Sequence, residues 1–330
     1  MKKVLLSILA VAAMASCVQS EDVNPQQLID FGSPFVGGTT KAIDPSYGQS
    51  DSDDSDGPVA LTSFNVYGTV DGGQGVVNLF DAVPVTGTVG GDVWSYADQY
   101  KKYWIPGAAH NFAAVVDAET VGKDANKMPT TLTPAKNNEG YLKDLLYAFS
   151  GPYTEAQVVN FDFDHLLAKA QFVVTSTTKD GYYYKVEGIK IHNFSTGTYT
   201  IATEAWATAD ENAKAYDLGV IAKVTADDAQ GVTNATQVLL IPTATEFKVE
   251  FKAMLCNDTG TADTADDIVL RTIDCTDTKA KVVAIKNDQD VLVGLQAGYA
   301  YNFNLALTQG TEIQFTVNNN PTWKDSNINL

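Results

Sequence analysis

The segment from Val158 to Val174 reads VVNFDFDHLLAKAQFVV and alternates apolar and polar residues as a half-buried β-strand does. Residues i and i+2 of a strand share a face, so Phe163 and His165 point one way. Asp162 and Asp164 point the other way. The imidazole and the two carboxylates therefore cannot converge on one metal ion or substrate. The segment therefore predicts a structural strand rather than a catalytic or metal-binding site.

The alternation shifts by one residue after His165, where Leu166 and Ala168 continue the apolar face. Such a shift predicts a β-bulge or bend, with the His165 ring placed to satisfy a backbone group. Asp162 and Asp164 would lie roughly 7 Å apart on the wetter face, which leaves a carboxylate pair for sugar hydrolysis as an alternative. No pocket-forming insertion or cluster of substrate-stacking rings accompanies them, so we predict no catalytic residue and no enzyme.

Short alternating runs recur at near-regular spacing from Pro58 to the end of the chain, which predicts an all-β fold of antiparallel sandwiches with few short helices. The clearest helical pattern is Tyr141–Phe149, with leucines at i, i+3 and i+4. Asp180-Gly181 lies between two alternating runs and predicts a hairpin. The chain of 330 residues has room for two domains, and the polar stretch Thr203–Asp217 indicates their boundary. We expect a signal at 1–17, a first strand and acidic linker at 18–57, and sandwiches at 58–204 and 205–330.

Charge and motif content exclude several classes of function. The net charge is −18 with a pI near 4.4, which repels nucleic-acid backbones. No zinc, phosphate-binding or nucleophile motif is present, and Arg271 is the only arginine. The run DSDDSDG (51–57) resembles a calcium loop but lacks both end ligands, so we interpret it as a linker. We predict no metal and no cofactor, and structural roles for His110 and His192.

The N-terminus MKKVLLSILAVAAMASC has two lysines, an apolar run too short to span a membrane, and small residues before Cys17. This is the pattern of a bacterial lipoprotein signal in which Cys17 is acylated; a plain signal peptide with an incidental cysteine is the alternative. Acyl chains would then tether the chain to a membrane. Cys256 and Cys275 remain, and in an exported protein they form either a disulfide or two free thiols.

Together these segments resemble the fimbrillin-like family, the outer-membrane lipoproteins that build or decorate type V pili. The resemblance rests on the lipoprotein start, on a first strand followed by TTKA (39–42), and on the opening segment. It also rests on YWIPGAAHNFAAVV (103–116), GYAYNFNLAL (298–307) and FTVNNNPTW (315–323). It implies two tandem transthyretin-like sandwiches, and an assembly role without catalysis at the outer membrane, the cell surface or the pilus.

The resemblance also implies how such a subunit assembles. Family members that polymerise lose their first strand to a trypsin-like protease, and the C-terminal strand of another subunit fills the groove. In this sequence the removable strand contains Leu28, Ile29 and Phe31, the cut falls between Lys41 and Ala42, and the donor strand carries Ile313, Phe315 and Val317. No arginine is present at the cut, which leaves two possibilities: a lysine-tolerant protease, or an uncut anchor or accessory subunit.

We therefore predict a structural or adhesive pilus subunit whose partners are other subunits, the outer membrane and a host or bacterial surface ligand. The rival is a non-polymerising surface lipoprotein that binds glycan or another host ligand. Exposed aromatic rings would serve that role, and one aromatic cluster is a candidate, although we expect it to pack the first sandwich instead. It consists of Trp94, Tyr96, Tyr100, Tyr103 and Trp104.

Overall fold

The structure is a computed structural model that describes residues 27–36, 61–88, 94–208, 214–228, 231–233, 236–242, 246–260, 267–284, 294–308 and 314–320. The described residues form β-strands and three short 3-10 helices, η1 (Asp98–Tyr100), η2 (Ile201–Thr203) and η4 (Asp277–Lys279). The all-β prediction is confirmed. Within these ranges no helix is long and apolar enough to cross a membrane.

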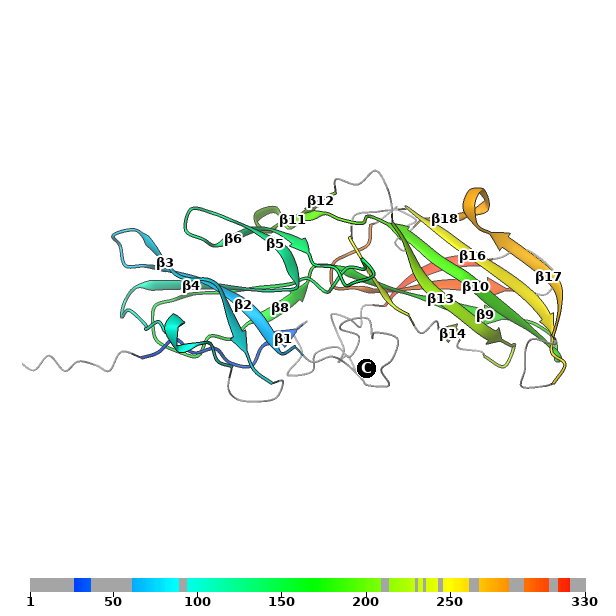
Figure 1. The fold of residues 1–330 in the computed structure, drawn as a ribbon, viewed down its shortest axis with the longest axis horizontal. Coiled ribbons are helices and arrows are strands. Elements are labelled where there is room, and N and C mark those ends of the chain that lie inside the picture. Colours follow the sequence, from blue (N-terminus) through cyan, green and yellow to red (C-terminus); the bar gives the residue numbers. More distant parts are fainter. Residues whose placement is uncertain are drawn as a thin grey trace, which may run out of the picture.

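The first half of the molecule is built on a six-stranded sheet with the order β1-β8-β7-β4-β2-β3. A four-stranded sheet, β12-β11-β6-β5, lies along one of its faces (Figure 1). Apolar side chains fill the space between the two sheets and also cover the opposite face of the larger sheet. The strands are β1 (Phe35–Val36), β2 (Ser63–Asp71), β3 (Val76–Thr86), β4 (Ala109–Val116), β5 (Ala118–Lys123), β6 (Pro129–Pro134), β7 (Leu146–Tyr153), β8 (Asp162–His165), β11 (Thr198–Thr200) and β12 (Ala205–Ala207).

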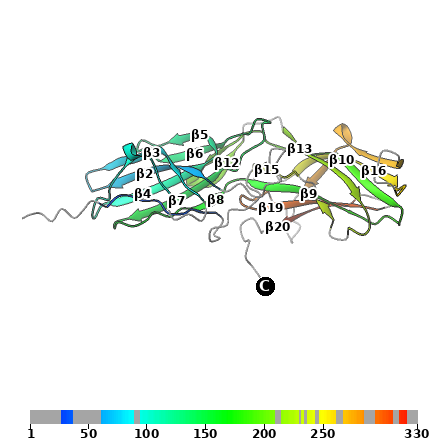
Figure 2. The same ribbon diagram turned by 60° about the horizontal axis from the view of Figure 1, so that its bottom comes forward.

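The second half contains two five-stranded sheets around one core, and it extends the molecule lengthwise (Figures 1 and 2). One sheet has the order β13-β10-β16-β17 with β18 also on β16, and the other has the order β14-β9-β19-β20 with β15 also on β9. The strands are β9 (Ala168–Ser176), β10 (Tyr182–Asn193), β13 (Lys214–Val224), β14 (Val232–Thr233), β15 (Val238–Leu240), β16 (Glu246–Asn257), β17 (Ile268–Cys275), β18 (Lys281–Ala284), β19 (Ala300–Leu307) and β20 (Gln314–Asn320).

The segment 158–174 is two strands rather than one bent strand. β8 pairs with β7 and β1 in the first half, whereas β9 pairs with β19 in the second half. The phase shift after His165 is the place where the chain crosses between the halves. The chain then returns, because β11 pairs with β6 before β13 joins β10. The last crossing, from β12 to β13, falls inside the polar stretch 203–217, but β9 and β10 precede it and already belong to the sheets of the second half.

Two local predictions are wrong. Residues 141–149 form no helix: from Leu146 onward they are β7, in which Leu146 and Ala148 are buried and Phe149 is exposed. The leucine spacing fits a helix, but the alternation that begins at Leu146 prevails because β4 offers a pairing partner. The hairpin at Asp180-Gly181 is wrong because β9 and β10 belong to different sheets; Gly181, with φ of +82°, turns the chain between them.

Cys256 and Cys275 are two free, buried thiols. Both belong to the β16–β17 hairpin, where Cys275 pairs with Phe251 and Cys256 pairs with Val269. Five residues along β16 separate the two cysteine levels, which is about 17 Å at the rise of a strand. A disulfide needs Cα atoms within about 7 Å, so the disulfide alternative fails. Burial raises the pKa of both thiols and keeps them protonated and unreactive.

Candidate functional site

Main-chain hydrogen bonds hold the first segment, residues 27–36, along both of its edges. On one edge it runs antiparallel to the chain around Tyr103. There the Ile29 N–H donates to the Lys102 carbonyl at 2.9 Å, and the Trp104 N–H donates to the Gln27 carbonyl at 2.9 Å. Each bond satisfies a backbone group that is otherwise unpaired in a largely apolar setting.

The opposite edge runs parallel to the chain that leads into β8. The Gly32 N–H donates to the Val159 carbonyl at 2.9 Å, and the Phe35 N–H donates to the Phe161 carbonyl at 2.8 Å. The first segment is thus an inserted strand rather than a strand laid on a finished sheet. Its removal would leave two rows of backbone donors and acceptors without partners.

The side chains of this strand complete the core of the first half. Ile29 is fully buried, and Phe31 and Val36 are only 2% and 4% exposed. We call the buried side chains that surround this strand the cradle. The Phe31 ring lies at its centre, with ring centroids 5.6 to 6.1 Å from those of Phe80, Tyr96, Phe112 and Phe161. Aromatic pairs at this spacing add to the stabilisation from buried area.

The predicted aromatic cluster forms part of the cradle. Trp94 and Trp104 are 3% and 5% exposed, which confirms that they pack the core. The Tyr96 hydroxyl donates to the Ile29 carbonyl at 2.7 Å, and burial raises its pKa to about 12. Tyr100 and Tyr103 remain exposed. The cluster is therefore not an open platform of five rings.

The other predicted assembly residues are only partly within the described chain. Leu28 pairs with Tyr103 at the start of the inserted strand. Cys17, Lys41, Ala42 and Ile313 lie outside the described residues. Phe315 and Val317 belong to β20, whose backbone pairs antiparallel with β19 at the edge of the second half.

The opening segment distributes its side chains as the alternation predicts. Phe163 and His165 are buried, whereas Asp162 and Asp164 are exposed. The His165 Nδ1 lies 2.7 Å from Oδ2 of the buried Asp144, a partner that the sequence did not indicate. Both exposed carboxylates line a cleft, but neither is buried in the apolar surroundings that a general acid requires.

The remaining histidines have structural partners. His110 is fully buried, and its Nδ1 lies 3.0 Å from the Ala108 carbonyl oxygen. His192 pairs with Glu250 at 3.1 Å. Within the described ranges no group of three or more His, Cys, Asp or Glu side chains is placed to hold a metal ion.

The cleft is lined by strands of both sheets of the first half and by Pro242 and Ala297 from the second half, and it has a volume of about 1060 Å³. Its lining includes rings from both sheets and several carboxylates. The sequence did not indicate these rings, because they come from strands distant along the chain and because one of them, Phe149, fits a helical pattern. They are Tyr147, Phe149, Tyr199 and Trp206.

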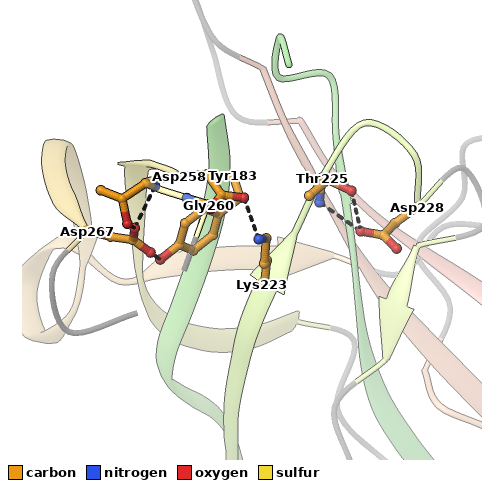
Figure 3. Close-up of polar contacts among 8 residues, drawn as sticks. Tyr183, Lys223, Thr225, Asp228, Asp258, Gly260 and Asp267 are labelled. Carbon is orange, nitrogen blue, oxygen red and sulfur yellow. Dashed lines mark hydrogen bonds and ion pairs between the residues drawn. The ribbon is translucent and has the colours of Figure 1, made fainter. Parts of the chain in front are cut away.

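A polar network ties a loop to the sheet at the far end of the second half (Figure 3). The Tyr183 hydroxyl donates to Asp267 at 2.6 Å, and Lys223 bonds Asp258 at 2.5 Å. The Tyr183 hydrogen bond, followed by a backbone N–H from Thr259, lowers the pKa of Asp267. These partners satisfy the carboxylates from within the protein, which is a structural arrangement.

A sequence profile of the fimbrillin-like family matches residues 57–321. The chain belongs to the fimbrillin-like family. Membership makes it a protein of the fimbrial, cell-surface type. A comparison with curated proteins gives no match.

One solved structure with a TM-score above 0.5 shows the same type of fold. A fimbrial protein from Bacteroides vulgatus is similar with a TM-score of 0.58 at 14% identity, over 78% of this chain and 92% of that chain. A "putative cell adhesion protein" from Bacteroides uniformis has a TM-score of 0.49 at 12% identity, over 91% of this chain and 98% of that chain. At these identities the likeness concerns the fold alone.

Proposed function

We propose that this fimbrillin-like protein is a structural or adhesive subunit of a type V-like pilus, assembled by exchange of its first strand. Export as a lipoprotein through Cys17 and a cut between Lys41 and Ala42 precede assembly. The observation that carries this proposal is the inserted strand 27–36, which is bonded along both edges and fills the aromatic core.

Loss of that strand creates a strong template for another strand. The cradle would expose the rings around the Phe31 position together with two unpaired backbone edges. An added strand recovers the hydrogen bonds through its main chain and the apolar burial through alternate side chains. The C-terminal strand of a second copy is the proposed donor, after it separates from β19.

The cradle selects the register of that donor. Residues 311–330 contain two large aromatic side chains, Phe315 and Trp323. With Phe315 in the Phe31 position, Ile313 takes the Ile29 position, because both strands read Ile-x-Phe. With Trp323 there, Pro321 would take the Ile29 position and lack the N–H that bonds Lys102. We therefore assign Phe315 to the Phe31 position.

One position of the cradle must adjust in this register. Gly32 is replaced by Thr316, and a Cβ at Gly32 would lie 2.1 Å from Oδ1 of Asn160. The Asn160 side chain is exposed, so it can rotate away at small cost. Val317 then takes the position of the half-buried Ser33.

Brief treatment of the chain from residue 18 onward with a trypsin-like protease tests the assembly. We expect a new N-terminus at Ala42 and a ladder of oligomers on a gel run without boiling. Lys41→Ala is the matched control and should remain uncut there and monomeric. Cleavage at Lys41 that yields only monomers would contradict the polymerising role and leave an accessory role.

A disulfide trap tests the register separately. Leu28 pairs with Tyr103 between two flanking hydrogen bonds, a geometry in which Cα atoms approach to about 4.5 Å, within disulfide range. Glu312 takes the Leu28 position in the assigned register. We expect the variant Glu312→Cys/Tyr103→Cys to form intermolecular disulfides in the cleaved polymer. The control Asn320→Cys/Tyr103→Cys represents the Trp323 register and should not; the reverse result would overturn the register while leaving strand exchange in place.

A further inference from the structure

The cleft in the first half carries an exposed aromatic ring where a sheet normally covers one. Phe149 is 53% exposed, although β7 lies between β4 and β8 inside the six-stranded sheet. Its neighbours Ala148 and Ser150 face the opposite side and are buried. The Phe149 ring therefore leaves apolar surface open within the cleft.

Rings from the smaller sheet contribute to the same cleft. Tyr199 and Trp206 come from paired positions on β11 and β12, with ring centroids 5.5 Å apart. The Trp206 Nε1–H donates to the Leu166 carbonyl at 3.1 Å, which fixes the indole. Tyr147 projects from β7 on the same face as Phe149, and burial raises its pKa to about 12, with Tyr199 contributing. The aromatic surface is therefore preorganised.

The charge of the cleft restricts its ligand. Its lining includes five carboxylates, and none of the described residues that line it is a lysine or an arginine. Glu204 and Asp164 both raise the pKa of Tyr199, after burial, so their charges act close to the rings. Sialylated, sulfated or phosphorylated ligands would meet negative potential here. The five are Asp71, Asp124, Asp162, Asp164 and Glu204.

The walls of the cleft also disfavour a peptide. They are largely faces and turns of sheets, and the backbone groups of β4 and β7 are already paired within their ladders. A peptide strand would find only the outer edge of β12, which is three residues long, whereas peptide recognition by sheets depends on main-chain pairing along an edge. A saccharide uses what the walls do offer: flat rings for its C–H faces, and carboxylate and amide groups for its hydroxyls.

We propose that the cleft is a binding site for an uncharged oligosaccharide. A sugar ring stacks on Phe149, and its hydroxyls donate to Asp162 and Asp164 and exchange hydrogen bonds with Asn111 and Asn126, all of which line the cleft. The volume of about 1060 Å³ is at the upper end of ordinary ligand pockets and accommodates several linked rings. The site would give an adhesive subunit its ligand, and it contains no residue of the removable strand.

A glycan array probed with the uncut chain from residue 18 onward tests the site. We expect retention on neutral oligosaccharides and loss of signal on the sialylated or sulfated forms of the same glycans. Titration with the neutral oligosaccharide that the array retains should show at least tenfold weaker binding for Phe149→Ala. Tyr103→Ala is the matched control, since Tyr103 is 43% exposed but lies outside the cleft, and its binding should be unchanged.

Three results would overturn the proposal: no retention on any neutral glycan, retention that survives Phe149→Ala, or equal displacement of the glycan by a lysine-rich peptide. Because Phe149 is exposed, the Phe149→Ala variant should unfold at the same temperature as the parent chain. Asp164→Asn provides a second substitution, on the exposed face of β8. The test uses uncut monomer, so it does not depend on whether the protein polymerises.

Discussion

Phe31→Ala in the uncut protein is expected to lower the free energy of unfolding by about 3–5 kcal/mol. The ring is 2% exposed and contacts four other aromatic rings, so its loss removes a large buried area and leaves a cavity. Urea unfolding monitored by tryptophan fluorescence should report the change, because Trp94 and Trp104 belong to the same core. An unchanged midpoint would contradict the inserted-strand arrangement.

Phe161→Ala separates the roles of the strand and of the cradle. Phe161 is fully buried and stacks on Phe31 with centroids 5.8 Å apart, so its truncation should destabilise the uncut chain by a similar amount. The two variants should differ after cleavage and assembly. The stability of the polymer should be unchanged by Phe31→Ala, because cleavage removes that strand, but it should be lowered by Phe161→Ala. Equal weakening of the polymer by both would mean that the first strand is retained.

Local patterns in the sequence predicted what depends on one strand at a time. The alternation in β8 correctly assigned Phe163 and His165 to the core and Asp162 and Asp164 to the surface. The same period identifies β19, whose tyrosine, phenylalanine and leucine residues are buried at alternate positions. A buried face imposes this period on any strand, so it is readable without knowledge of the partner strand.

Pairing between distant segments could not be read in this way. The sequence does not show that β8 and β9 belong to different halves, because one apolar face looks the same whichever sheet covers it. The helical pattern at 141–149 and the hairpin at Asp180-Gly181 failed for the same reason: each is a reasonable local solution that long-range pairing overrides. The cleft was missed because its rings meet only after β7, β11 and β12 are assembled.

His165→Leu is expected to lower the free energy of unfolding by about 3–5 kcal/mol, because it leaves a buried carboxyl group without its partner. Asp144 is 1% exposed, and its Oδ2 lies 2.7 Å from His165 Nδ1. Its Oδ1 has no hydrogen-bond partner among the described residues, so His165 provides the polar contact that the structure assigns to this carboxyl group. Thermal and urea denaturation of the uncut chain would measure the loss.

The double variant Asp144→Leu/His165→Leu decides between a lost polar pair and a simple packing defect. If the loss of stability comes from the unpaired carboxyl group, removal of both polar groups should recover much of the stability that His165→Leu loses. The coupling energy between the two substitutions should then be about 1–3 kcal/mol. If the defect is steric, the two single losses should add. Because Asp144 precedes β7 and His165 ends β8, additivity would mean that the pair does not join these two segments.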